Sequence, residues 1–323
     1  MTTGNTFQDV VDSQIHSIVD LAAEQAAQEI EGRDLFSMYQ VSATDEKLQG
    51  ISGAGYGRLT LEGQQYAANQ LWRDYPASIT VRKYTSELTY TEEDVYYIEQ
   101  MKKGGNATGA QLRLNSIASQ AIPPLTGNIN ADIAKMFYLG FGSTFFTGGD
   151  SQCLIDSDHP IRKTGSTQSN TATKAFSPSE LTTAVNAMNL FQGQNGRRLK
   201  PVRRLCVVCH SNLLPTVQQA LDSQYGPLNA NLGLQTGSRA AFKGRGVEVS
   251  YLALTEIPVA YANYWWVVDL DRAQNRFFLA YAWMPRSAQE TVPRNGTFAI
   301  DSSTVIGPTA LGWQWIYGST GTT

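Results

Sequence analysis

The segment of this sequence whose residue types could most clearly carry out chemistry is CVVCH, Cys206 to His210. Cys-x-x-Cys-His is the pattern that attaches a c-type haem covalently. Two thiols and an imidazole could also bind a metal ion. The segment therefore raises the hypothesis of a haem or zinc protein. That hypothesis depends on whether the two cysteines can reach the same group.

The residues around the motif argue against a shared haem or metal ion. Leu205 to Cys209 is a continuous apolar run, and its two adjacent valines favour a buried strand. Side chains of a strand alternate between its two faces. Cys206 and Cys209 lie three positions apart, so they should point to opposite faces. We interpret both thiols as small buried hydrophobic groups.

A second candidate site lies in CLIDSDHP, where Cys153 and His159 could join a later cysteine in a zinc site or form a nucleophile–base pair. The spacing matches no common structural zinc pattern. A nucleophile–base pair needs a pocket and an orienting group, which the sequence does not identify. The chain has only 3 histidines. We therefore expect a protein that is not an enzyme, with no catalytic residue, cofactor or bound metal.

Composition narrows the class of protein. The chain has 323 residues, 42% of them hydrophobic, which suffices for one large domain or two ordinary ones. The net charge of -3 shows no basic excess of the kind that binds DNA tightly, although a protein that only encloses DNA needs none. No secretory signal and no run of eighteen apolar residues is visible. With 3 cysteines, we expect a cytosolic product with reduced thiols and no membrane association.

The first half of the chain alternates between amphipathic and polar segments. Residues 7–30 have apolar positions at helical spacing, and the glycine-rich segment 50–57 is expected to act as a hinge because it lacks a dinucleotide-binding context. Residues 58–76 form a long polar hairpin without a buried face of its own, followed by strands at 79–84 and 87–91. Such a hairpin usually packs on a partner.

A long interrupted helix follows, and the second half then mixes strands and helices. Pro123-Pro124 should break the helix, and Ser177 should cap a later one. The polar stretch 164–173 is predicted to be a flexible linker, and the Ser/Thr/Gly tail to be disordered. Further strands are expected at 205–209, 247–254, 264–270, 276–283 and in WQWIYG, with DRAQN as a hairpin loop between the third and fourth of these.

Several segments resemble the major capsid protein of tailed bacteriophages, which has the Hong Kong 97 fold, and in particular its Mu-like head-subunit branch. CLIDSDHP followed by STQSNT is similar to that branch's Leu-Phe-Ser-x-x-His-Pro turn and Ser-Asn. YWWVVDLDRAQNRFFLAYAW is similar to its late Trp-x-Leu-x-Asp segment, and LGWQWIYGSTG fits the way those chains end. LTTAVNAMNLFQGQNGRRLKPVRRLCVVCHSNLLPTVQQALDS also fits, except that Cys209 and His210 stand where the family usually has Val-Pro. The resemblance covers most of residues 45–320.

The resemblance implies an α+β fold with five parts. Residues 1–48 would be the N-terminal arm, 49–86 the extended loop, 87–149 the peripheral domain with its long spine helix, 150–280 the axial domain, and 281–323 the strands that complete both domains. The implied function is a shell subunit that forms hexamers and pentamers of an icosahedral virion capsid, assembled in the host cytoplasm. That shell would enclose double-stranded DNA without sequence-specific binding. A separate scaffold, a portal and a decoration protein are further implied partners.

Two other interpretations stay open at this point. An encapsulin-like nanocompartment shell has the same fold, and a haem or zinc protein would use Cys206, Cys209 and His210. For the shell interpretation, charged residues of the polar hairpin and its root are the candidate inter-subunit contacts: Arg58, Glu62, Arg73, Asp74, Arg82 and Lys83.

Overall fold

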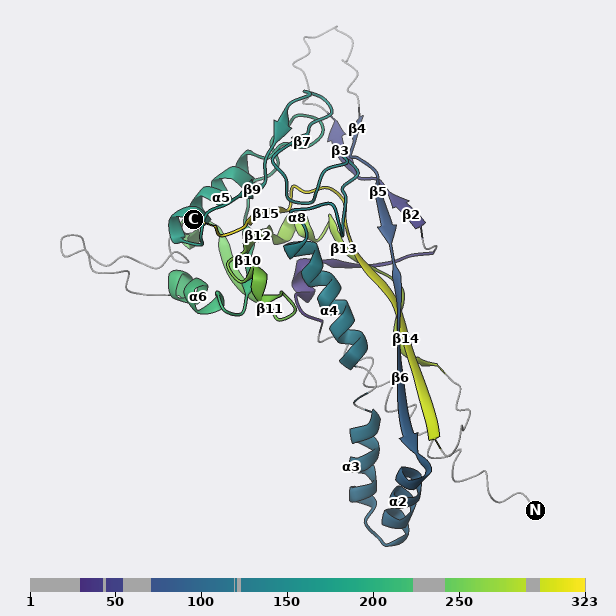
Figure 1. Ribbon diagram of the computed structural model, residues 1–323. Coiled ribbons are helices and arrows are strands. Elements are labelled where there is room, and N and C mark those ends of the chain that lie inside the picture. The colour runs from purple at the N-terminus through teal and green to yellow at the C-terminus, as the bar shows by residue number, and fades with distance from the viewer. Residues whose placement is uncertain are drawn as a thin grey trace, which may run out of the picture.

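The architecture is known from a computed structural model, which describes residues 30–42, 45–54, 71–118, 120, 123–222, 242–288 and 297–322. A wide body carries a long narrow extension made of strands and helices (Figure 1). The helix predicted for residues 7–30 lies almost entirely outside the described residues, as does most of the polar hairpin, residues 55–70.

The centre of the body is a five-stranded sheet. Its order is β11–β10–β12–β15–β9, with bounds Glu248–Leu254, Arg204–His210, Trp265–Asp269, Ile316–Ser319 and Thr171–Ala172. Strand β10 runs parallel to β11 and antiparallel to β12. Both central strands are buried along nearly their whole length, which explains why RLCVVCH and WWVVD lack apolar–polar alternation.

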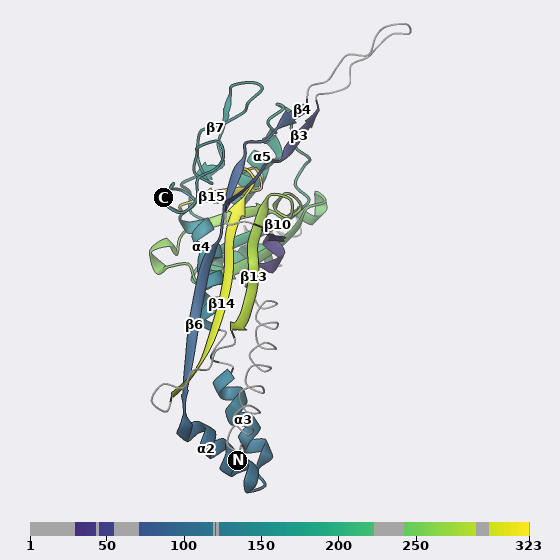
Figure 2. The same cartoon turned by 90° about the vertical axis from the view of Figure 1, so that its right-hand side faces the viewer.

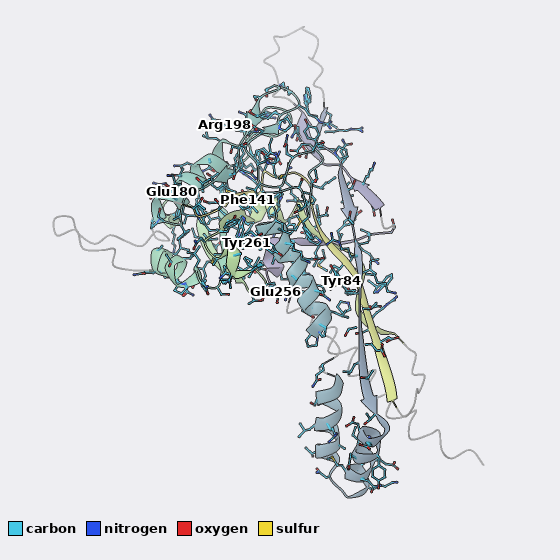
Figure 3. The ribbon with its side chains drawn as sticks, in the orientation of Figure 1. Tyr84, Phe141, Glu180, Arg198, Glu256 and Tyr261 are labelled. Carbon is cyan, nitrogen blue, oxygen red and sulfur yellow. The ribbon has the colours of Figure 1, made fainter. Side chains whose placement is uncertain are left out.

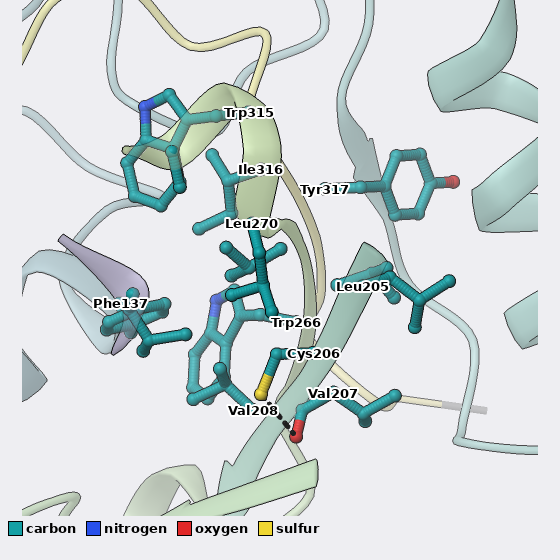
Figure 4. Packing of buried hydrophobic residues seen from close by; sticks show 14 of the residues in the cluster. Phe137, Leu205, Cys206, Val207, Val208, Trp266, Leu270, Trp315, Ile316 and Tyr317 are labelled. Carbon is teal, nitrogen blue, oxygen red and sulfur yellow. Dashed lines mark hydrogen bonds between the residues drawn. The ribbon is translucent and has the colours of Figure 1, made fainter. Parts of the chain in front are cut away.

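Two helices and several aromatic side chains pack around this sheet. Helix α5 (Pro178–Leu190) begins as predicted, because the Ser177 hydroxyl accepts a hydrogen bond from the Glu180 amide at 3.2 Å. Helix α6 (Leu214–Asp222) follows β10. Phe137 packs edge to face on Trp266, with ring centroids 5.6 Å apart, in the main core (Figure 4).

A second, four-stranded sheet carries the extension. Its order is β1–β13–β14–β6, with bounds Ser37–Gln40, Phe277–Ala288, Thr297–Ala310 and Arg82–Thr91. Strands β14 and β6 pair in antiparallel register from Thr297–Thr91 to Ile306–Arg82. In Figure 2 these strands run side by side from the body down to the helical tip.

Three helices follow β6. They are α2 (Glu92–Lys103), α3 (Ala107–Ala118) and α4 (Pro123–Tyr138). Thr91 and Asp94 form a capping box at the start of α2. The predicted interruption at Pro123-Pro124 is confirmed, because the two prolines open α4, where a missing amide proton costs no helical hydrogen bond. None of the helices in the described ranges combines the length and apolarity needed to cross a bilayer.

Short elements connect the larger ones. The two-stranded pairs are β2 (Asp45–Leu48) with β5 (Ala77–Thr80), β3 (Ile51–Ala54) with β4 (Leu71–Arg73), and β7 (His159–Pro160) with β8 (Thr167–Gln168). The short helices are η1 (Arg33–Leu35), η2 (Val259–Tyr261) and α8 (Leu270–Ala273).

The predicted linker at 164–173 is wrong. The segment contains β8, β9 and the fully buried Asn170. The Asn170 amide donates to the carbonyl oxygens of Leu154 and Ile316 at 2.9 and 3.2 Å, and its oxygen accepts from the Asp156 amide at 2.8 Å. A polar sequence can therefore be buried here because main-chain groups replace water as its partners.

Two further predictions are also wrong. DRAQN is not a hairpin loop, because β12 and β13 belong to different sheets and Asp269 caps the short helix α8 between them. The tail up to Thr322 is ordered: Ser319 is fully buried, and its hydroxyl donates to the Lys174 carbonyl at 2.6 Å. Hydrogen bonds to other parts of the backbone determine the structure of both DRAQN and the tail, and amino-acid composition does not predict such bonds.

Candidate functional site at the root of the β3–β4 segment

Cys206 and Cys209 both lie within β10, between β11 and β12. Both side chains are buried in the main core, and Figure 4 shows Cys206 there. Burial raises the pKa of the Cys206 thiol to about 11 and that of Cys209 to about 12. The thiolate needed for nucleophilic attack or metal binding is therefore disfavoured. This geometry fits the structural interpretation of the two cysteines and does not fit a haem-attachment segment.

His159 also has its ring nitrogens engaged by protein groups. Its Nδ1 lies 2.9 Å from Asp150 Oδ2 and its Nε2 lies 3.2 Å from Asn170 Oδ1. The ring stacks on Trp313, with centroids 4.3 Å apart. Burial raises the pKa of the Cys153 thiol. Among the described residues, no group of three or more His, Cys, Asp or Glu side chains is placed to hold a metal ion. The arrangement of His159 holds a loop in position.

The more informative site is the point where the polar segment leaves the body, residues 50–54 and 71–76, which we name the hairpin root. Strands β3 and β4 pair there, and the Asp74 amide donates to the Gly50 carbonyl at 2.9 Å. The buried Asp74 carboxylate accepts a hydrogen bond from Ser52 and lies 3.5 Å from Arg276 Nη2. A Cβ at Gly50 would stand 2.6 Å from that carboxylate, so a larger residue there would force the Asp74 side chain to shift.

Two loops of the body hold the hairpin root. The Gln194 amide donates to the Ser52 hydroxyl at 3.1 Å, and the Asn195 side-chain amide donates to the Ser52 carbonyl at 2.7 Å. On the other side, a Cβ added at Gly149 would overlap the carbonyl oxygen of Pro76. These contacts set the direction in which the segment leaves the molecule, with no catalytic geometry among them.

The six residues predicted to contact other subunits differ in their exposure and in their partners within the chain. Arg58 and Glu62 lie outside the described residues. Arg73 and Lys83 are exposed, on β4 and β6. Asp74 is buried and already paired inside the chain, as described above. Arg82 lies 3.6 Å from Asp132 of α4 through its Nη1.

Asp132 organises a second polar cluster, between β6 and α4. Its buried carboxylate accepts hydrogen bonds from the Tyr84 hydroxyl and from Lys135 Nζ, the latter at 2.8 Å. Figure 3 shows Tyr84 on the strand side of this junction. Burial, with the hydrogen bond to Asp132, raises the pKa of Tyr84 to about 12. The cluster locks the extension to the body at its base.

The tip of the extension is a feature that sequence reasoning missed. Tyr96 and Tyr97 on α2 are 57% and 52% exposed, and Leu112 on α3 is 64% exposed. Tyr96 and Tyr97 stand in the apolar run VYYI and resemble core residues in the sequence, so only the structure reveals that three large exposed apolar groups share one helical hairpin. Exposed apolar groups gathered on one element often mark a contact surface.

Comparison with known proteins identifies the fold. No protein-family model matches the sequence. No curated protein matches it either. A chain of the cyanophage A-1(L) capsid aligns over 90% of this chain and 92% of its own, with TM-score 0.55 and 11% identity. A chain of Mycobacterium phage Adephagia aligns over 89% and 87%, with TM-score 0.50 and 9% identity.

The virus-like particle of Pyrococcus furiosus aligns over 93% of this chain and 97% of that one, at 10% identity and TM-score 0.47, too weak a likeness to favour one kind of shell over another. Together with the mixed helices and sheets, the two stronger alignments show the α+β capsid fold of the Hong Kong 97 type.

Proposed function

We propose that this chain is the major capsid protein of a tailed phage, which assembles with copies of itself into the icosahedral shell around a double-stranded DNA genome. The observation that carries the proposal is the nearly end-to-end likeness to the cyanophage A-1(L) capsid chain, at TM-score 0.55. A fold alone does not determine function. The projecting shape of the chain and its exposed apolar side chains provide separate support for self-assembly into a shell.

The shape of the chain supports self-assembly. The β6–β14 ribbon and the α2–α3 hairpin project far from the main core (Figure 1). The hairpin presents Tyr96, Tyr97 and Leu112 to solvent in an isolated subunit. A projecting element with an apolar tip is best explained by a partner that covers it, and in a symmetric shell the partner is another copy.

The proposed parts of the subunit follow the boundaries suggested by the family resemblance. Residues 1–48 are the arm and 49–86 the extended loop, which leaves the body at the hairpin root. Residues 87–149 form the peripheral domain, in which α4 is the spine helix. Residues 150–280 form the axial domain around the five-stranded sheet, and 281–323 complete both sheets.

Exposed charges near the hairpin root are the proposed ionic contacts between subunits. Arg73, Arg82 and Lys83 are the members of the predicted set that combine exposure with a place in the described residues, and Arg82 also lies near Asp132 of its own chain. Each exposed pair contributes about 0 to 1 kcal/mol, but symmetry repeats it over the shell. Raising the salt concentration should therefore lower the yield of particles before it lowers the melting temperature, and a yield that is flat with salt would contradict ionic contacts.

We place the chain in the Mu-like branch of major head subunits, and the proposed shell consists of hexamers and pentamers of this chain. Its location is the virion, after assembly in the host cytoplasm, and its role is structural rather than catalytic. A separate scaffold chain, a portal and a decoration protein are proposed partners. The DNA is enclosed without recognition of its sequence.

Electron microscopy of the expressed full-length chain tests the proposal. Closed shells of uniform size, or rings of five and six subunits, are the expected result. A chain that stays monomeric at every concentration and salt level, with a cooperative melting transition, would overturn it. The neighbouring genes provide a second, independent test. Terminase and portal genes would support a phage shell, whereas a single gene for a cargo enzyme would support a nanocompartment.

A further inference from the structure

Positive charge is concentrated in one part of this acidic chain. Residues 159–221 contain 8 Lys and Arg but only 1 Asp or Glu, a net charge of 8 − 1 = +7, while the whole chain has -3. The remainder therefore carries -3 − 7 = -10. Such segregation creates a local positive potential that the total conceals.

Four of these cations stand on two loops that touch each other: Arg162, Lys163, Arg198 and Lys200, which we name the basic loop surface. The first loop joins β7 to β8, and the second spans residues 192–200. The amides of Arg162 and Lys163 donate to the side chain and the carbonyl of Gln194, at 2.9 and 3.2 Å. The two loops therefore form one surface.

The loops are rigid supports for these side chains. Gly165 and Gly196 turn them with positive φ of 67° and 71°, and the Gly196 amide donates to Gly193 at 2.9 Å. The carbonyl of Lys200 accepts a hydrogen bond from Arg272 Nη2 at 2.6 Å. In Figure 3 Arg198 lies at the outer edge of the body, beyond α5. The cations are thus presented outward by a fixed backbone.

The charges of this surface are not neutralised inside the subunit. All four side chains are exposed, and within the described ranges none of them forms an ion pair with a carboxylate. Arg162 stacks over the Tyr75 ring, 4.0 Å from its centroid, which leaves the charge in place. These four charges are therefore available to an anion from outside the subunit.

We propose that the basic loop surface contacts the phosphate backbone of the enclosed duplex DNA and therefore faces the interior of the shell; this rests on the proposed function. Phosphates are bound by Lys and Arg together with hydroxyl and amide donors, and the first loop also carries Thr164 and Ser166. Neither loop carries a large exposed apolar side chain, which the centre of a protein–protein interface needs. Contacts to phosphate carry no sequence information, so the sequence of the duplex is not read.

The test uses unassembled full-length chain and a fluorescent 20-base-pair duplex of random sequence. Four phosphate contacts predict a salt slope of about -3.6, so affinity should fall about 150-fold between 50 and 200 mM salt. The double variant Arg198→Ala/Lys200→Ala should reduce the slope to about -1.8 and that loss to about 12-fold. Lys103→Ala is the matched control: this exposed lysine of α2 pairs with Glu99 and should leave the slope unchanged.

The outcomes separate this proposal from the proposed function. Closed shells should not bind the external duplex, and the double variant should still form shells and melt as the wild type does. Arg162→Ala/Lys163→Ala provides a second pair if the first variant melts early. An unchanged slope in both variants, or equal DNA binding by intact shells, would overturn the proposal. It would also be overturned if the variants instead lost affinity for a peptide of residues 1–31, which has 6 carboxylates and no Lys or Arg.

Discussion

Removing residues 55–70 should separate folding from assembly. Strands β3 and β4 pair with Ala54 opposite Leu71, so a two-residue Gly-Ser turn can replace the 16 residues between them. The hairpin root stays intact, including Asp74, which is buried and paired with Arg276. We expect the shortened chain to fold into the same body and to lose the ability to close shells.

The effect on stability can be worked out from loop closure. Each halving of a loop lowers the closure cost by about 0.6 kcal/mol, so three halvings, from 16 residues to two, favour the folded state by about 1.8 kcal/mol. The melting temperature should therefore be unchanged or rise by roughly up to 5 °C. A control chain with a Gly-Ser segment of the original length separates the effect of length from that of sequence.

Thermal melting beside analytical ultracentrifugation measures both properties. The expected result is a cooperative melt with sedimentation as monomers or loose capsomers. Closed particles from the shortened chain would refute the role of residues 55–70 in assembly. Loss of the melting transition would show instead that the segment belongs to the subunit's own core.

Three further predictions concern the fold. Gly149→Ala should lower the melting temperature, because its Cβ would overlap the Pro76 carbonyl, whereas Gly127→Ala inside α4 meets no atom within 4 Å and should stabilise by about 0.5–1 kcal/mol; equal effects on melting would contradict this. Cys206→Ala with Cys209→Ser should reduce the free energy of unfolding by about 1–3 kcal/mol without loss of any absorbance band, measured by denaturant titration. Tyr84→Phe should reduce the loss of folding stability at alkaline pH. In the folded chain the pKa of Tyr84 is raised to about 12, above its value near 10 in the unfolded chain, so its contribution to stability is complete below pH 10 and is lost as the pH rises through 12. Identical alkaline limbs in urea titrations would show that Tyr84 is not the responsible group.

Local signals in the sequence predicted some regular elements and missed others, such as strand β3 in the segment expected to be a hinge. Ser177-Pro178 located the start of α5, and the unbroken apolar run identified β10, because capping and two-sided burial leave marks within a few residues. The opposite-face argument for Cys206 and Cys209 needed only the period of a strand. These features depend on neighbours in sequence.

Features that depend on distant partners could not be predicted in this way. Asn170 reads as part of a linker until Leu154 and Ile316 supply its hydrogen-bond acceptors. Asp74 reads as an exposed charge until Arg276, 202 positions later (276 − 74), lies 3.5 Å from it. A polar side chain carries no local record of whether water or the protein will satisfy it. The burial of one charge at the hairpin root therefore could not be predicted from the sequence.

The net charge of the chain is a poor guide to its affinity for DNA, because it does not show which charges the fold brings together. The total of -3 argued against affinity for nucleic acid, yet it is the sum of a segment with +7 and a remainder with -10. Coulomb interactions are screened beyond about 8 Å at physiological salt, so a bound phosphate responds to the nearby loops and not to the chain as a whole. A shell subunit has two faces with different surroundings, and one number cannot describe both. The distribution of charge over the folded surface is the quantity that bears on DNA, and the contact between the β7–β8 loop and residues 192–200 turns dispersed cations into one surface.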